Sequence, residues 1–508
     1  MASLTCHICN VSLLLGPSGV GFGGVIAALR RRTLAPVQRT AHREEGAGLP
    51  VIATEENAMT LLPRRGVKAS LISLAIVATA CSSGGGPTAA PQAGCNAGTT
   101  QVLFWTSHTP PDTDSMKHMV DAFNKQSTTS CVKMVAVPGS ETDIAKLTTA
   151  VRGGTGPDVY ELDRFTVAER AAAGVLTDLS SFGAANESSN YLDFAWKEAL
   201  FKGKPYALPF DTDARALFYN KDMLQAAGID ASALDISKGA PTIDTIRTMA
   251  NKLNKKDASG KYTVVGFVPA LSQGWHYTWG FAYGGSFFDA NSCKVTPNDP
   301  KIVQAFQDMF WNWSGALGVD ALQTFLSTYA PTTPPLPTEQ DAFLTGHIGF
   351  VVTGPWVLSW FPQYKPNLHY GITYIPVPHE GDQPATWAGG WSVVIPKGAK
   401  NAKGGYEFMK YFAGEAGQRV YTKETQHMPT WKPLLSDSSL YQGDLSLFVK
   451  LLPSAHSRPA LPVGSLYWDQ LSTAQDAALR HSKDPAVALK DAATATNDKL
   501  QQYCPLAA

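Results

Sequence analysis

The chain has 508 residues, of which 44% are hydrophobic and 17% are charged, which excludes the disordered and fibrous classes and predicts a globular protein of two or more folding units. Lysine plus arginine and aspartate plus glutamate both number 42, so the formal net charge is zero, and no nucleic-acid partner is expected, because such partners favour a basic surface. The 12 tryptophans and 17 tyrosines suit a surface that stacks on a neutral, ring-shaped ligand, although most of them must be core residues.

The chain begins with a segment that does not read like the rest. Residues 1–58 show no clear periodicity, and a secretion signal begins only at Met59, where basic residues precede the apolar stretch 69–80. That stretch is too short to span a bilayer and fits the core of a signal peptide. A signal peptide cannot act from position 59 of a long chain. We therefore predict that translation starts at Met59 and that residues 1–58 are a mis-annotated extension; the alternative is a real but unusual leader.

The signal ends in a sequence that resembles a bacterial lipobox, Ala78-Thr79-Ala80-Cys81. Residues 59–80 are then a lipoprotein signal peptide, and Cys81 is lipidated and becomes the mature N-terminus. The segment 81–96 is rich in glycine, serine and proline and predicts a flexible tether. We expect a protein anchored by lipid to the extracytoplasmic face of a bacterial cell membrane.

Four cysteines remain in the mature chain, Cys95, Cys131, Cys293 and Cys504. An even number in an oxidising compartment makes disulfides plausible, and four cysteines allow three pairings. Cys95 and Cys131 each precede a predicted strand. If those strands are neighbours, these two cysteines can bridge, which leaves Cys293 with Cys504.

The mature chain opens with alternating strand and helix patterns. Strands are predicted at 100–105 and 132–137, helices at 116–124 and 143–151, and a third strand follows the turn at 156–160. This alternation predicts a parallel sheet covered by helices. Ligands bind outside the carboxyl ends of the strands in such sheets, which directs attention to the segments that follow the first and third strands.

Later elements are spaced more widely. One helix ends near Gly228, and Thr242 is a suitable N-cap for the next. A strand is predicted at 392–395, an amphipathic helix at 406–413, and a helical tail from Leu471. No internal repeat is found.

Five short motifs occur in a recognisable order: Gly-x-Gly-Pro-Asp-Val at 154–159, Lys-Pro-Tyr-Ala-Leu-Pro at 204–209, Tyr-Asn-Lys-Asp at 219–222, Gly-Pro-Trp at 354–356, and Gly-Gly at 389–390 before a strand. Together they resemble the extracellular solute-binding proteins of carbohydrate ABC importers, in particular the maltose- and trehalose-binding members. The similarity covers nearly all of the mature chain. Five motifs in order behind a lipobox are specific for the family but not for its ligand.

The resemblance implies an α/β, two-lobed periplasmic-binding-protein fold of type II, with a ligand cleft between lobes joined by a hinge. We expect the chain to cross between lobes near 209–213, 389–391 and 434–441. The expected lobes are 97–209 plus 392–437 and 213–388 plus 438–508. Hinged lobes also meet a physical need, because a polar ligand must be desolvated to be held and then released.

The resemblance further implies polar ligand contacts. Asp163 and Arg164 follow the third strand, where family members contact sugar hydroxyls; the alternative is a surface ion pair. Asp213 stands where a ligand-facing carboxylate is found, and Asp211 competes with it, because a slip of one residue changes which side chain faces the cleft. Arg458 lies in a segment that reaches the sugar in related proteins.

Aromatic and loop residues complete the expected site. Trp275 and Trp356 stand at stacking positions, although each could be a core residue, and Trp391 could line the cleft or pack the hinge. Trp468 lies in the same segment as Arg458. The last two candidates follow the first strand and could equally be solvated loop residues, Ser107 and His108.

The function expected from these residues is capture of a sugar, an oligosaccharide or amino sugar, and its delivery to the permease subunits of an ABC importer. We expect a monomer without cofactor or metal, and no enzymatic activity. The main alternative is a glycerophosphodiester ligand, for which Arg164 or Arg458 could supply the cation. A secreted glycosidase is a weaker alternative, because it needs two carboxylates flanking the bond and no segment clearly presents such a pair.

Overall fold

The computed structural model describes residues 94–137, 139, 145–331 and 338–506, all within one compact unit that spans residues 86–508. The predicted N-terminal extension, the signal peptide and the lipidation site Cys81 lie outside the described residues, as do most of the tether and the first two residues of the helix expected at 143–151.

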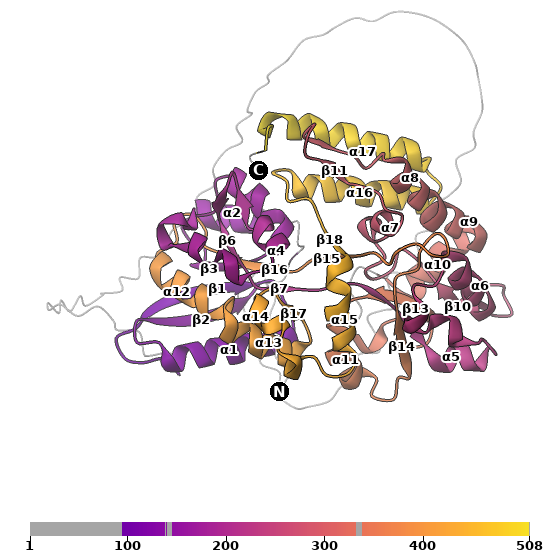
Figure 1. Cartoon of the computed structure of the whole chain (residues 1–508), viewed down its shortest axis with the longest axis horizontal. Coiled ribbons are helices and arrows are strands. Elements are labelled where there is room, and N and C mark those ends of the chain that lie inside the picture. Colours follow the sequence, from indigo (N-terminus) through magenta and orange to yellow (C-terminus); the bar gives the residue numbers. More distant parts are fainter. Residues whose placement is uncertain (1–93, 138, 140–144, 332–337, 507–508) are drawn as a thin grey trace, which may run out of the picture. The chain divides into compact units, whose positions relative to one another are not determined.

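A five-stranded sheet organises the N-terminal part of this unit (Figure 1). Its order is β2 (Ser130–Ala136), β1 (Thr100–Thr106), β3 (Val159–Asp163), β16 (Trp391–Val394) and β6 (Ala207–Pro209). Strand β1 is parallel to β2 and β3, whereas β16 is antiparallel to β3 and β6. The prediction of a parallel sheet is therefore right for the first three strands, and a strand from much later in the chain is inserted beside them.

Helices cover the faces of this first sheet: α1 (Asp112–Gln126), α2 (Ala145–Arg152), α3 (Val167–Ala172), α4 (Asp193–Glu198), α12 (Ala402–Phe412) and α13 (Glu415–Thr425). Helix α1 buries Met116, Met119, Val120 and Phe123, the spacing of an amphipathic helix that faces a core. It begins four residues before the predicted start at 116, because its polar first turn carries Asp112 and Asp114, and acidic residues are favourable there.

A second five-stranded sheet organises the middle of the chain. Its order is β14 (Tyr370–Thr373), β8 (Ala216–Asn220), β13 (Ile348–Thr353), β10 (Tyr262–Phe267) and β9 (Lys255–Lys256). The surrounding helices are α5 (Lys221–Ala226), α6 (Ile243–Leu253), α7 (His276–Ala282), α8 (Pro300–Phe306), α9 (Trp313–Leu317), α10 (Val319–Tyr329), α11 (Val357–Tyr364), α16 (Gly464–Leu479) and α17 (Pro485–Leu500). The Thr242 hydroxyl accepts a hydrogen bond from Thr245 N at 3.1 Å, which confirms the predicted N-cap of α6.

Short paired segments link the two sheets. Strand β7 (Asp211–Thr212), which follows β6 and precedes β8, pairs with β17 (Met428–Pro429). Strand β15 (Thr386–Ala388), which leads into β16, pairs with β18 (Ala455–Ser457). The third connection runs from α13 through α14 (Lys432–Leu435) and α15 (Leu445–Leu451) to β18. The exact lobe boundaries proposed from the sequence stay predictions.

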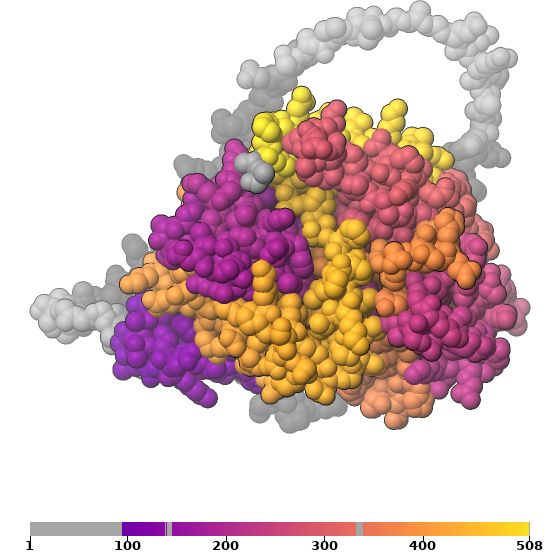
Figure 2. Space-filling view, in the orientation of Figure 1, coloured from indigo at the N-terminus to yellow at the C-terminus, as the bar shows by residue number. Residues whose placement is uncertain are grey.

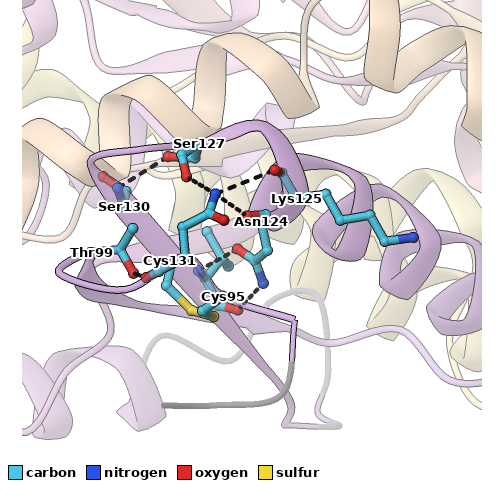
Figure 3. Close-up of a disulfide and its surroundings, with 9 residues drawn as sticks. Cys95, Thr99, Asn124, Lys125, Ser127, Ser130 and Cys131 are labelled. Atoms are coloured by element: carbon cyan, nitrogen blue, oxygen red, sulfur yellow. Dashed lines mark hydrogen bonds between the residues drawn. A yellow bond between two sulfur atoms is a disulfide. The ribbon is translucent and has the colours of Figure 1, made fainter.

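Two disulfides fasten the ends of the described chain. Cys95 is bonded to Cys131 and Cys293 to Cys504, with Cα–Cα distances of 5.7 and 6.1 Å; these are the two pairs favoured from the sequence. Figure 3 shows the first bridge at the start of β2, near the C-terminal end of α1. The side-chain amide of Asn96 also donates to Ser127 O at 2.7 Å, so the N-terminal segment is held at two points.

No helix among the described residues is long and apolar enough to cross a membrane.

Candidate functional site

A cavity of about 240 Å³ lies among the segments that link the two sheets. Charged groups and aromatic rings from both sheets' surroundings share its wall. The lining residues are His108, Asp112, Asp163, Asp213, Arg215, Gln273, Trp275, Trp356, Trp360, Trp387, Gly390, Trp391, His427 and Arg458. Because a few convergent polar groups in an aromatic concavity are typical of small-molecule sites, this cavity is the candidate functional site.

The part of the wall next to the first sheet is built around His108, just after β1. Its Nε2 lies 3.2 Å from Glu161 Oε1, and its Nδ1 lies 3.6 Å from Asp112 Oδ2. Thr106 Oγ1 donates to the other oxygen of Glu161. Burial alone lowers the pKa of His108, but the facing carboxylates outweigh it and raise the pKa well above its ordinary value. The two acids beside the imidazole therefore favour its protonated form.

Asp163, the last residue of β3, forms an ion pair with Arg458, which follows β18. Arg458 Nη2 lies 2.6 Å from Asp163 Oδ1, and both side chains are almost completely buried. The Arg458 guanidinium lies 4.0 Å from the centroid of the Phe165 ring and 5.0 Å from that of Trp387. The pair thus joins the end of the first sheet to a strand from the C-terminal part of the chain.

A second arginine–aspartate pair stands at the first connection between the sheets. Arg215 Nη1 donates to Asp213, and Arg215 Nη2 donates to Gln273 Oε1 at 3.1 Å. Asp213 also accepts from Gly389 N at 2.6 Å. The guanidinium lies 3.5 Å from the centroid of the Trp387 ring, so its charge is shared between a carboxylate and an aromatic face.

Two glycines in the recognised motifs make room for this arrangement. A Cβ at Gly354 would lie 2.0 Å from the ring of Trp356, so the Gly-Pro-Trp sequence lets that ring fold over its own backbone. Gly390 has a φ of 126°, and a Cβ there would lie 2.4 Å from Asp211 O. Both positions therefore require glycine, and both place a tryptophan within two residues at the cavity wall.

Seven of the ten ligand contacts expected from the sequence line the cavity: His108, Asp163, Asp213, Trp275, Trp356, Trp391 and Arg458. Asp213 rather than Asp211 does so. Asp211 is instead buried at the connection, where its Oδ1 accepts from Trp391 N at 2.6 Å, and burial raises its pKa well above the ordinary value.

Three expected contacts are not in the lining: Ser107, Arg164 and Trp468. Arg164 has no exposed surface, because it bonds to Glu198 at 2.8 Å and to the carbonyl oxygens of Asp211 and Gly389. It ties the two connections to the first sheet, and its expected role as a ligand contact is corrected to a structural one. Trp468 packs edge-on against Trp275, with ring centroids 4.8 Å apart, and supports the wall from behind.

Several lining residues were not predicted from the sequence. Two of them could have been identified from their spacing to a predicted contact. Arg215 is two residues from Asp213 in extended chain, and Trp360 is four residues from Trp356 on a helix. Each therefore shares a face with a predicted contact. Asp112 ends the segment 106–112 that follows the first strand, to which the sequence directed attention, but the residue itself was not singled out. The remaining unpredicted residues are Gln273, Trp387, Gly390 and His427.

A larger cavity of about 860 Å³ is lined by α4, α7, α14 and the segment around β18, and it shares Arg458 with the first. Figure 2 shows the molecule hollowed between these elements. Its walls are mainly apolar, with Phe194, Phe281 and Phe288 among them, and the Lys432–Asp193 ion pair at its edge is exposed. The smaller cavity collects far more buried charge, which makes it the better site for a polar ligand. Among the described residues, no group of three or more histidine, cysteine, aspartate or glutamate side chains is arranged so that it could hold a metal ion.

Comparison with known protein families identifies the family to which the chain belongs. Residues 108–419 match the family described as bacterial extracellular solute-binding protein, and the chain belongs to this family. It is 20% identical to a maltotriose-binding protein of Pyrococcus abyssi, over 77% of this chain and 80% of that protein. It is 23% identical to a galactooligosaccharide-binding protein of Bacillus subtilis, over 82% of this chain and 93% of that protein. A probable ABC transporter-binding protein of Deinococcus radiodurans is 27% identical, over 74% and 88%.

Solved structures define the fold. The protein CpMnBP1 with mannobiose bound has a TM-score of 0.68 and 22% identity, and the match covers 78% of this chain and 99% of that one. A substrate-binding protein from Listeria monocytogenes in complex with cycloalternan has a TM-score of 0.66 and 20% identity, over 79% and 99%. The fold is therefore the two-lobed α/β fold of periplasmic-binding proteins of type II, as expected from the sequence motifs.

Proposed function

We propose that this protein binds a neutral sugar in the 240 Å³ cavity and presents it to the permease of an ABC importer. The observation that carries the proposal is the cavity wall itself. Five tryptophans share it with two buried arginine–aspartate pairs: Trp275, Trp356, Trp360, Trp387 and Trp391 with Asp163–Arg458 and Asp213–Arg215. Sugar rings have apolar faces for the former and hydroxyl groups for the latter.

The charges in the wall favour a neutral ligand. Asp163 is paired with Arg458 and Asp213 with Arg215, so each arginine already has a carboxylate partner. A phosphodiester would have to compete with these carboxylates for the guanidinium groups. A hydroxyl group can instead donate to a carboxylate and accept from an arginine without disturbing either pair. The paired arginines thus support a sugar over the glycerophosphodiester alternative.

The same pairs argue against the glycosidase alternative. Hydrolysis needs one carboxylic acid that donates a proton and a second carboxylate that attacks or activates water. The two candidates, Asp163 and Asp213, are each engaged by an arginine, so neither carboxylate is free to act as the acid or as the attacking group. Binding without covalent chemistry is the activity that these residues support, and it agrees with membership of a solute-binding family.

The setting of the protein follows from the family and the N-terminal sequence. We infer an extracytoplasmic, monomeric protein whose mature chain starts at Cys81 and is anchored through lipid on that residue. Mass spectrometry of the protein extracted from membranes tests the anchor. The expected mature mass is that of the chain from Cys81 plus lipid, and a chain that begins before Met59 would contradict the proposed start.

A thermal-shift screen tests the proposed ligand class. Purified protein is heated with neutral sugars, amino sugars and glycerophosphodiesters, because a ligand that binds only the folded state raises the melting temperature with its concentration. We expect a shift with one class of sugar, which is lost in Asp163→Ala and Trp356→Ala and kept in the control Trp311→Phe, outside the cavity lining. A shift with phosphodiesters alone would contradict the proposal.

A further inference from the structure

One carboxylate in the cavity wall has an oxygen without a hydrogen-bond partner. Asp112 is 5% exposed, and its Oδ2 faces His108. Its Oδ1 is buried and accepts no hydrogen bond within the part of the chain that the structure describes. A buried polar atom left in this state is destabilising, so each such atom in a native protein calls for an explanation.

A role in helix α1 does not provide that explanation. Asp112 is the first residue of the helix, and an acidic side chain there interacts favourably with the helix dipole. Asp114 lies in the same turn and supplies that charge from an exposed position. A purely helical role would leave Asp112 hydrated like its neighbour. Its burial in the cavity wall indicates a partner inside the cavity.

Trp360, on helix α11 near the second sheet, has a hydrogen-bond donor without a partner in the described chain. Its indole Nε1 is buried and donates no hydrogen bond to any described residue, although the side chain lines the same cavity. Other buried indole groups are satisfied: those of Trp279, Trp313 and Trp387 donate to oxygen atoms at 2.8 to 3.1 Å. Asp112 Oδ1 is thus an acceptor and Trp360 Nε1 a donor that have no hydrogen-bond partner among the described residues, and they lie on helices that pack around different sheets.

The charge state of Asp112 limits which groups of a ligand can hydrogen-bond to it. Burial raises its pKa, but His108 and His427 outweigh this, and the net pKa lies below its ordinary value. The ionised carboxylate can only accept hydrogen bonds. A ligand must therefore offer a donor at this end and an acceptor at the Trp360 end. Hydroxyl groups do both, so a sugar can meet both atoms through its hydroxyls, whereas a glycerophosphodiester would have to meet Asp112 through its glycerol, because its ionised phosphodiester group only accepts.

We propose that Asp112 and Trp360 are specificity-determining ligand contacts, in which Asp112 accepts from one hydroxyl of the ligand and Trp360 donates to another of its oxygen atoms. A neutral, polyhydroxylated ring fits both. This inference rests on the proposed function, because it places the sugar in the same cavity, and it adds two contacts from different parts of the chain.

Calorimetric titration of the purified protein tests the inference. The probes are mannobiose, maltose and the neutral sugar with the largest thermal shift, with glycerophosphocholine as the phosphodiester. We expect Asp112→Asn to weaken sugar binding about 10-fold, since the amide oxygen still accepts but the hydrogen bond is no longer made to a charged group. The matched control is Asp114→Asn, which removes the same charge from an exposed position of the same turn and leaves the affinity within twofold.

Trp360→Phe provides a second, independent test that keeps the ring and removes only the donor. We expect about a fivefold loss of sugar affinity, as for one neutral hydrogen bond, with the melting temperature of the unliganded protein unchanged. If the wild type binds sugar and both variants bind it equally well, the inference is overturned and the proposed function stands. If the wild type binds glycerophosphocholine and no sugar, or binds none of the probes, the proposed function fails and the inference fails with it.

Discussion

The two sides of the candidate site differ in character. The side next to the first sheet is the more ionic: His108, Asp112 and Asp163 line it beside Trp391, and Glu161 lies directly behind. The side next to the second sheet is the more aromatic, with Trp275, Trp356 and Trp360 beside Arg215. For the proposed ligand, this difference means that separate parts of the chain would recognise the hydroxyls and the ring faces of the sugar, and that full affinity would require both.

The largest effect is expected from the ionic side. Asp163→Ala removes hydroxyl-binding oxygens and leaves Arg458 buried without its carboxylate. Breaking one partner of a buried ion pair destabilises a protein by about 3–5 kcal/mol, and we expect sugar affinity to fall more than 100-fold. Chemical denaturation and calorimetry measure the two quantities. A normal affinity in a destabilised protein would show that the ion pair is only structural.

The aromatic side should respond more moderately. Trp356→Ala removes one stacking face while the ionic side stays intact, and we expect the affinity to fall about 30-fold, equivalent to roughly 2 kcal/mol of lost apolar contact. Trp356→Phe retains part of the face and should lose less than half of that free energy. Equal losses in both variants would mean that the indole is needed for something other than its ring face.

The ionic side should also give the protein a pH dependence that the aromatic side lacks. The folded-state pKa of His108 is raised above its ordinary value of 6.5. Its stabilising contribution is therefore fully present below about pH 6.5 and is lost as the pH rises through the folded-state value. We expect the melting temperature of His108→Asn to fall below that of the wild type by more at pH 6 than at pH 9.

The control for this comparison is His118→Asn, at an exposed histidine that contacts Glu424 on the surface. The difference between this variant and the wild type should be small at both pH values. If His108→Asn behaves in the same way, the buried cluster of His108, Asp112 and Glu161 does not carry the charge assigned to it.

The smallest effects are expected just outside the cavity. Ser107 and Trp468 are not in the lining, so Ser107→Ala and Trp468→Phe should change sugar affinity less than twofold in calorimetry. A larger loss for Ser107→Ala would extend the ionic side beyond His108. A larger loss for Trp468→Phe would show that the ring behind Trp275 helps to set the aromatic side.

Much of the fold was predictable because its signals are local. Alternating strand and helix patterns predicted β1, β2 and β3 with the helices between them, and the capping residue of α6 was identified correctly. The family resemblance assigned residues 392–437 to the first lobe, but the pairing of β16 with β3 was not predicted, since it joins Trp391 to Asp163, residues far apart in the sequence. The helical tail begins at Gly464 rather than Leu471. Its first turn carries glycine and serine, which do not favour a helix, so this earlier start was not predicted.

The site was predictable where a strand end fixes the direction of a side chain. Asp163 is the last residue of β3 and lines the cavity, whereas Arg164 begins a 3-10 turn and points to Glu198 instead. Neighbouring residues at a strand end face different ways, so a conspicuous dipeptide does not imply two ligand contacts. The segment 106–112 was identified from the sequence, but Asp112 was not singled out within it, because its contact with His108 forms only in the folded protein.

A crystal structure of the protein with its tightest-binding neutral sugar tests the central claim most directly. The account predicts a sugar ring in the 240 Å³ cavity, with a hydroxyl within hydrogen-bond distance of Asp112 and a ring face against Trp356. A sugar bound instead in the 860 Å³ cavity lined by α4 and α7, or one that contacts neither Asp112 nor Trp356, would contradict it.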